Sequence, residues 1–188
     1  MKNAILIHGV CDKEEYFNDE YPSLSNSHWF PWLQKQLLIQ GIHTQTPEMP
    51  DAYFPAYEKW SKEFERFDIT KETILVGHSC GCGFLLRWLT ENKVMVGNVL
   101  LVAPWLDPEK SISPDFFEFD IDPGIVLRAA KLKILVSSDD EEDVLVSVKQ
   151  IQKSLPNIPI RQFEGFGHFT KEEMRREDFP ELLNELIS

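Results

Sequence analysis

The stretch Thr73-Ile74-Leu75-Val76-Gly77-His78-Ser79-Cys80-Gly81 decides how this chain folds. Its apolar first half reads as a buried strand, and the following Phe84-Leu85-Leu86-Arg87-Trp88-Leu89 reads as a helix. The sequence therefore predicts a strand, a very tight turn and a helix, with Ser79 at the turn. A strained backbone there projects the serine hydroxyl above the sheet, and glycines two residues before and after it leave room for the neighbouring elements.

The pattern Gly-x-Ser-x-Gly between a strand and a helix resembles the nucleophile elbow of α/β-hydrolases. The turn also leaves backbone N–H groups free at the helix start, where developing negative charge is favoured. The resemblance implies that Ser79 is a catalytic nucleophile. A glycine-rich turn in a non-catalytic α/β domain is the alternative interpretation.

The composition is that of a soluble globular protein. The chain has 188 residues, of which 43% are hydrophobic and 27% charged, so we expect residues 1–188 to form a single domain. A net charge of −12 argues against nucleic acid and anionic membranes as partners, because both require clustered Lys and Arg. Three cysteines do not make an even disulfide framework, and together with the absence of a long apolar run they predict a cytoplasmic protein.

Short apolar runs alternate with helical patterns along the chain, which indicates a parallel sheet with helices on both faces. The predicted strands are Ala4–His8, Ile42–Thr46, Thr73–Val76, Val96–Val102, Lys133–Ser137 and Pro159–Phe163. The predicted helices are about His28–Gln40, Pro55–Phe67, the segment from the elbow to Glu91, Val144–Leu155, and two short ones that follow Thr170 and Asp178. Right-handed crossovers favour a doubly wound sheet of order 2-1-3-4-5-6, whose crevice lies between the loops after His8 and Val76.

A serine nucleophile needs a base and an orienting acid, which in α/β-hydrolases follow in the order acid, then histidine. His168 is the only histidine after Ser79, and it lies in a glycine-flanked loop directly after the last strand. We therefore predict that His168 is the base, the alternative being a surface-loop histidine. The acid comes from the loop Ser137–Asp143, where Asp139 is the first choice and Asp140 the second; other acidic residues of this loop are solvated or cap the next helix.

An oxyanion hole needs two donors aimed at the developing charge. The predicted donors are the N–H groups of Cys80, which follows the nucleophile, and of Val10 in the loop after the first strand. Gly9 lets that loop approach the substrate closely. His28, near the start of a helix, and Trp105, where the chain leaves the sheet at its catalytic end, are the other predicted substrate-binding residues.

The segment Leu106–Gly124 is rich in Pro and Asp and carries three phenylalanines. It is either a small lid over the crevice, which we favour, or a packed connection. No cofactor is predicted, because the sequence has neither a Gly-x-Gly-x-x-Gly stretch after the first strand nor a phosphate-binding loop. No metal is predicted either, because Cys80-Gly81-Cys82 has the wrong spacing for zinc.

Taken together, the chain resembles the YdeN-like small serine hydrolases, the α/β-hydrolase family that also includes retinoblastoma-binding protein 9. Its most specific stretch is Asn26-Ser27-His28-Trp29-Phe30-Pro31-Trp32-Leu33, accompanied by Met49-Pro50-Asp51, the elbow, Ser138-Asp139-Asp140 and Gly167-His168-Phe169. The resemblance implies a compact α/β-hydrolase fold and a triad of Ser79, Asp139 and His168.

The sequence thus predicts a serine hydrolase that cleaves small esters or related acyl compounds through an acyl-enzyme. Two alternatives stay open. One is a protein of the same fold that turns over slowly and acts mainly through protein interactions, with partners that the sequence does not identify. The other is a thiol-dependent enzyme that uses Cys11 or Cys80.

Overall fold

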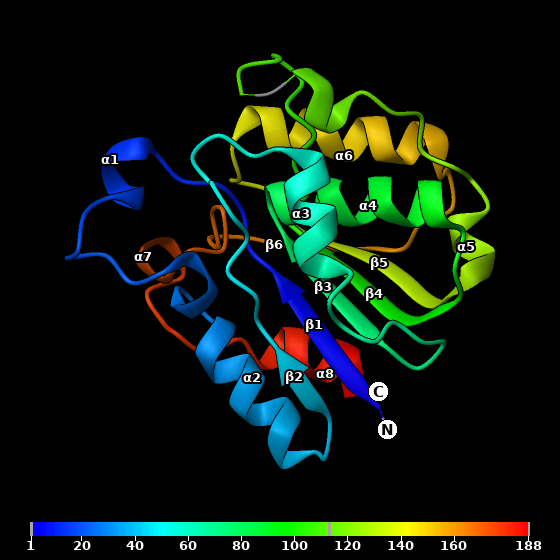
Figure 1. The fold of residues 1–188 in the computed structure, drawn as a ribbon, viewed down its shortest axis with the longest axis horizontal. Coiled ribbons are helices and arrows are strands. Elements are labelled where there is room, and N and C mark those ends of the chain that lie inside the picture. The colour runs from blue at the N-terminus through cyan, green and yellow to red at the C-terminus, as the bar shows by residue number, and fades with distance from the viewer. Residues whose placement is uncertain (1, 113, 188) are drawn as a thin grey trace.

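A six-stranded parallel sheet forms the centre of the computed structural model, which describes residues 2–112 and 114–187 (Figure 1). The strands lie in the order β2-β1-β3-β4-β5-β6, which confirms the predicted order. All neighbouring pairs are parallel. Their bounds are β1 Asn3–Ile7, β2 His43–Gln45, β3 Ile74–His78, β4 Val96–Val102, β5 Ala129–Ser137 and β6 Ile160–Phe163.

Helices cover both faces of this sheet. They are α1 Lys13–Tyr16, α2 Phe30–Ile39, α3 Tyr57–Phe64, α4 Cys80–Asn92, α5 Ile125–Arg128, α6 Glu142–Ser154, α7 Lys171–Met174 and α8 Pro180–Ile187, with 3-10 turns η1 at Leu24–Asn26 and η2 at Pro114–Phe117. Figure 1 shows α2 and α8 on one face and α3, α4 and α6 on the other. Coverage on both faces explains why the central strands are apolar almost throughout.

The packing behind the elbow is largely aromatic. Trp60 and Phe64 of α3 meet Phe84 of α4 edge to face, with ring centroids 5.7 and 5.4 Å apart. Phe116 of η2 closes this cluster, 5.1 Å from the ring of Trp60. All four side chains are fully buried. Because each such pair adds about 0.5–1.5 kcal/mol beyond area burial, the cluster fixes α3 and η2 against the helix that carries the elbow.

The start of α4 lies directly against β1. A Cβ atom added to Gly81 would stand 2.3 Å from the carbonyl oxygen of Ile7 and 2.6 Å from that of His8. Both obstacles are backbone atoms, one in β1 and one directly after it, so they cannot move aside at low energetic cost. Glycine at this position is therefore a requirement of the close strand–helix contact.

We expect Gly81→Ala to lower the free energy of unfolding by about 2–4 kcal/mol or to prevent folding, because the added methyl overlaps the backbone of β1. Gly41→Ala is the matched control: Gly41 has a φ of +76° but nothing within 4 Å of its Cβ position. It should cost only about 1 kcal/mol. Denaturant unfolding compares the two, and equal losses would contradict a steric requirement at the elbow.

Some predicted boundaries are wrong for identifiable reasons. The helix expected from His28 begins at Phe30, because His28 has a φ of +56°, which no α-helix accommodates. The strand expected at Lys133–Ser137 begins earlier, at Ala129, because β5 pairs with β4 from that residue onward. The short helix α1 was not predicted, since four residues show no measurable helical period.

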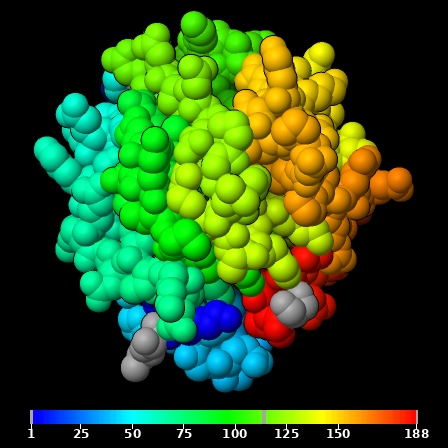
Figure 2. Space-filling model, turned by 90° about the vertical axis from the view of Figure 1, so that its right-hand side faces the viewer, coloured from blue at the N-terminus to red at the C-terminus, as the bar shows by residue number. Residues whose placement is uncertain are grey.

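The segment Leu106–Gly124 is anchored to α4 in its described part. Arg87 of α4 donates a hydrogen bond to the carbonyl oxygen of Phe116 at 3.1 Å. Within the segment, the Asp107 carboxylate accepts a hydrogen bond from the N–H of Ser111 at 2.7 Å. Figure 2 shows the yellow-green chain around residue 125 filling the surface between the green α4 and the orange chain beyond residue 150. These contacts favour the packed connection over the lid.

Candidate active site

Ser79 stands alone between two regular elements, because β3 ends at His78 and α4 begins at Cys80. Its backbone has φ 54° and ψ −122°, a conformation that costs a non-glycine residue on the order of 1–3 kcal/mol. Two backbone hydrogen bonds hold it there: the Ser79 N–H donates to Val102 at 3.0 Å, and the N–H of Trp105 donates to the Ser79 carbonyl at 3.2 Å. The predicted strained turn is therefore present, with the serine at its apex.

His168 and Asp140 form a hydrogen-bonded pair beside this serine. The Nδ1 atom of His168 lies 2.8 Å from Oδ1 of Asp140, whose side chain is buried. The carboxylate can only accept, so Nδ1 carries the proton and Nε2 keeps a free lone pair. Ser79 and His168 line the same two cavities, although no hydrogen bond joins their side chains among the described residues. Catalytic hydrogen bonds are often long before substrate binds.

The prediction that Asp139 pairs with His168 is wrong. Asp139 is exposed, and its Oδ1 accepts hydrogen bonds from the Ser137 hydroxyl and, at 2.9 Å, from the N–H of Gly165. The chain turns between Ser137 and Asp140, whose N–H donates to the Ser137 carbonyl at 3.3 Å. This turn sends the two neighbouring aspartate side chains in different directions. Asp140 reaches the histidine ring, and Asp139 ties down the start of the histidine loop.

Two further residues hold the backbone of His168, and no sequence pattern indicates either role. The N–H of His168 donates to Oε2 of Glu173 at 2.8 Å, and Nε2–H of His78 donates to the carbonyl oxygen of His168 at 2.8 Å. Thr170 to Glu173 was predicted as the start of a helix, which the Thr170 side chain does cap. The same glutamate reaches back to the loop, so the histidine is fixed by ring and backbone together.

The pKa of His168 is shifted in the opposite direction from the pKa values of the other histidines in the site. Burial disfavours its charged form, but the hydrogen bond and charge of Asp140 outweigh burial and raise the pKa of His168 above its usual value. Burial lowers the pKa of His8 and of His28, and burial together with the neighbouring imidazoles of His168 and His28 lowers the pKa of His78 far more. His168 therefore gains a proton most easily of these four.

His8 has a structural role in this arrangement. Its Nε2 accepts a hydrogen bond from the N–H of Met49 at 2.8 Å, and its Nδ1–H donates to the carbonyl oxygen of Gly9 at 2.8 Å. Both ring nitrogens are thus occupied by backbone groups. His8 fixes the loop after β1 and has no nitrogen left for proton transfer.

The loop after β1 and the start of α4 surround the serine hydroxyl. A Cβ atom on Gly9 would lie 3.0 Å from Cβ and 3.4 Å from Oγ of Ser79, so glycine allows this close approach. Cys80 is the first residue of α4, where the N–H groups have no acceptor within the helix. Val10 follows Gly9 and lines both cavities at the serine. The two predicted oxyanion donors therefore lie in the loop after β1 and at the start of α4, the two segments next to the serine hydroxyl.

Two cavities open at the serine. The larger, about 580 Å³, is lined by Gly9, His28, Ser79 and His168 among others. The smaller, about 380 Å³, is lined by Trp105 and Ile112 together with Ser79 and His168. All three predicted substrate-binding residues thus share a cavity with the nucleophile. Of the described part of Leu106–Gly124, only Ile112 lines either cavity.

The cysteines are poor candidates for nucleophiles. Burial, followed by the charges of Glu15, Glu48 and Asp12, raises the pKa of Cys11 to about 12. Burial also raises the pKa of Cys80 well above its usual value. A thiol that stays protonated at neutral pH is a weak nucleophile, which argues against the thiol-dependent alternative. Among the described residues, no group of His, Cys, Asp and Glu is placed to hold a metal ion.

A serine at the β3–α4 turn of a sheet in this order is the arrangement of the α/β-hydrolase class, and solved structures that are similar to this chain share its fold. The chain matches the serine hydrolase family over residues 20–181. It belongs to that family and is an enzyme of the hydrolase type.

Relatives with related sequences and folds agree with this assignment. The chain is 28% identical to YdeN of Bacillus subtilis (strain 168) over 167 residues, which cover 86% of this chain and 88% of YdeN. The crystal structure of the B. subtilis ydeN product has a TM-score of 0.82 at 24% identity, covering 99% of this chain and 97% of the other. A YdeN-like protein from Pectobacterium atrosepticum has a TM-score of 0.66 at 17% identity, covering 99% and 89%. No helix of the described residues is long and apolar enough to cross a membrane.

Proposed function

We propose that this chain hydrolyses small esters or related acyl compounds with a triad of Ser79, His168 and Asp140. One observation carries the proposal: His168 forms a 2.8 Å hydrogen bond with the buried carboxylate of Asp140. The same histidine lines both cavities that contain Ser79, whose backbone is strained. A base with its own orienting acid is what a serine hydroxyl needs to become a nucleophile.

In the first half-reaction, Nε2 of His168 takes the hydroxyl proton as Ser79 Oγ attacks the acyl carbonyl. The negative charge that develops on the carbonyl oxygen is bound by the N–H groups of Cys80 and Val10, each worth on the order of 10²–10³ in rate. His168 then gives its proton to the departing alcohol, and the acyl group stays on Ser79. Asp140 stabilises the imidazolium while it exists.

In the second half-reaction, a water molecule replaces the alcohol. His168 removes its proton as the oxygen attacks the acyl-enzyme, and the proton returns to Ser79 as the ester bond breaks. The products are a carboxylate and the free enzyme. A protein of the same fold that turns over slowly would need no acid to orient the histidine, so the contact between Asp140 and His168 favours the hydrolase over that alternative.

A panel of short-chain para-nitrophenyl esters tests this proposal. We expect turnover with an initial burst of nitrophenol, because acylation and deacylation are separate steps, and we expect intact-mass analysis to find an acylated enzyme. Folded protein that hydrolyses none of these esters faster than buffer would overturn the proposed function.

The pH dependence identifies the base. We expect kcat/KM for a neutral ester to rise with pH, with an apparent pKa above the ordinary histidine value of about 6.5, because only neutral His168 can accept the serine proton. The pKa values of His8, His28 and His78 are lowered, so the titration of none of them would produce a rise of kcat/KM in that pH range, the rising limb of the profile. In Asp140→Asn the limb should move to lower pH, since the charge that favours imidazolium is gone while burial persists. A limb that does not move in Asp140→Asn speaks against His168 as the titrating group.

A further inference from the structure

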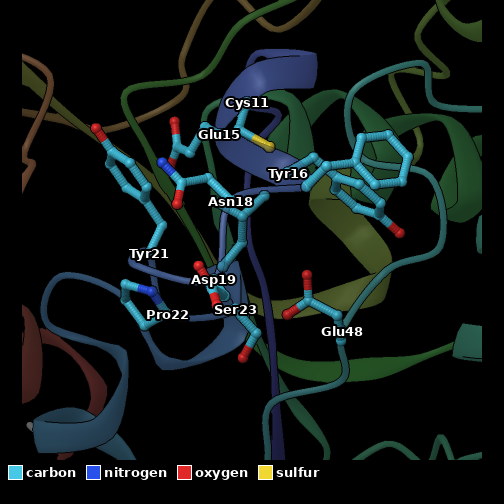
Figure 3. A pocket seen from close by; sticks show the side chains of 11 residues that line it. Cys11, Glu15, Tyr16, Asn18, Asp19, Tyr21, Pro22, Ser23 and Glu48 are labelled. Carbon is cyan, nitrogen blue, oxygen red and sulfur yellow. The ribbon is translucent and has the colours of Figure 1, made fainter.

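Two cavities contain Ser79, a third lies beside them, and one acidic residue lines all three. The third cavity, about 410 Å³, lies beside the two at Ser79 and is formed by α1, the chain that follows it and Glu48 (Figure 3). Glu15 of α1 lines this cavity and both cavities that contain Ser79. A substrate bound at Ser79 in either of the first two cavities therefore lies in a cavity that Glu15 lines.

The cavity walls are acidic on both sides of the serine. In the smaller cavity at Ser79, Asp12 and Glu15 come from the β1–α1 region, and Glu141 and Asp143 come from the start of α6. No Lys or Arg is among the described residues that line it. Among the described residues that line the larger cavity, Lys171 is the one Lys or Arg, and it forms an ion pair with Glu177.

Glu15 itself has no counter-charge. Among the described residues, its carboxylate forms neither an ion pair nor a hydrogen bond, whereas Glu48 accepts from the N–H of Ser25 at 2.9 Å. Burial and then the charges of Asp12 and Glu172 raise the pKa of Glu15. The carboxylate thus lies in a region of negative potential, and a bound cation would stabilise it.

The third cavity adds aromatic surface to this charge. Tyr16, Phe17 and Tyr21 line it together with Glu15 and Glu48, and the rings of Tyr16 and Phe17 are 5.1 Å apart. Tyr16 and Tyr21 are among the side chains labelled in Figure 3. Aromatic faces next to carboxylates attract amines and quaternary ammonium groups by their quadrupole as well as by charge. They offer nothing comparable to a carboxylate or a phosphate.

Resting on the proposed function, we propose that the acyl compounds cleaved at Ser79 carry a positively charged amine or quaternary ammonium group, and that Glu15 is the residue that selects them. The charge lies in the acyl or the alcohol part, whichever occupies the cavities beside α1. The same walls repel anionic substrates. They also repel the carboxylate product, which helps it to leave.

Two matched pairs of esters test the proposal. In one pair the acyl chain ends in a trimethylammonium group or in its neutral tert-butyl isostere, and both are para-nitrophenyl esters. In the other pair the alcohol is choline or its neutral carbon isostere. We expect kcat/KM to be about tenfold higher for the cationic member of at least one pair, falling toward equality between about 0.02 and 0.5 M salt.

Two variants assign the effect to Glu15. Glu15→Gln should reduce the cationic-to-neutral ratio by about threefold or more. Glu14→Gln is the control, because it removes the same charge from the same helix. Glu14 is exposed and lines none of the three cavities. It should keep the wild-type ratio. Equal rates within both pairs, or a ratio that Glu15→Gln leaves unchanged, would overturn the proposal.

A binding measurement separates this proposal from the proposed function. Titration calorimetry of Ser79→Ala protein with the same esters reports charge preference without turnover. If Ser79→Ala protein binds the cationic member more tightly but wild-type protein hydrolyses no ester, the charge selection is supported and the esterase function is rejected. Equal binding of both members rejects the charge selection, whatever the wild type hydrolyses.

Discussion

Ser79→Ala is expected to lower kcat for ester hydrolysis by about a thousandfold or more, because the acyl-enzyme cannot form without the hydroxyl. The residual rate should be that of substrate bound next to oxyanion donors and attacked by water. Initial rates with a para-nitrophenyl ester measure the decrease in kcat. The enzyme concentration must be high enough to resolve the residual rate of Ser79→Ala.

Ser138→Ala serves as the control, since Ser138 is exposed and its backbone N–H, which donates to Phe163 at 2.9 Å, is kept. It should retain the wild-type rate. Ser79→Ala must also unfold cooperatively at a denaturant concentration close to that of wild type. A Ser79→Ala protein that keeps more than a tenth of the activity would contradict the mechanism.

Asp140→Asn is expected to lower kcat by about 10³–10⁴-fold, while Asp139→Asn lowers it by less than about tenfold. The Asp140 carboxylate accepts the Nδ1 proton of His168 at 2.8 Å, and an amide there neither enforces that tautomer nor stabilises the imidazolium. At position 139, an asparagine oxygen can still accept from Ser137 and from Gly165, so the loop keeps its anchor.

These neighbouring substitutions change the same atoms on adjacent residues, so each is the control for the other. Steady-state kinetics with one neutral ester gives both kcat values. If Asp139→Asn were the more damaging of the two, the acid assigned from the sequence would be right and the pairing in the structure would not be the working one.

The elbow and the sheet order were predictable because both depend on local, strongly patterned sequence. The run from Thr73 to Gly81 combines strand propensity with two glycines at fixed spacing, and Gly81 proves to face the Ile7 carbonyl of β1. Alternating strands and helices then leave few right-handed arrangements of a parallel sheet. His168 was predictable because it is the only histidine after Ser79.

The acid could not be chosen from the sequence, because Asp139 and Asp140 are chemically identical and adjacent. Which one faces the histidine depends on the backbone turn between Ser137 and Asp140, and no residue in that loop signals the turn's conformation. The residues that hold the histidine loop were hidden for a similar reason. Glu173 reads as part of a helix start, and its contact with the N–H of His168 depends on how the chain returns across the sheet.

The acidic cavities were equally out of reach of sequence patterns. Glu15 lies on a helix of four residues that shows no periodicity, and Glu141 follows it by more than a hundred residues. Only the fold brings the start of α6 and the β1–α1 region to the same edge of the sheet, on either side of Ser79. An overall charge of −12 does not indicate where that charge gathers.

The most direct test of the central claim, that Ser79 is an activated nucleophile, is intact-mass analysis after incubation with a fluorophosphonate. We expect one adduct on wild-type protein, slower labelling of Asp140→Asn and no labelling of Ser79→Ala. Folded wild-type protein that gains no adduct, or a Ser79→Ala protein that gains one, would contradict it.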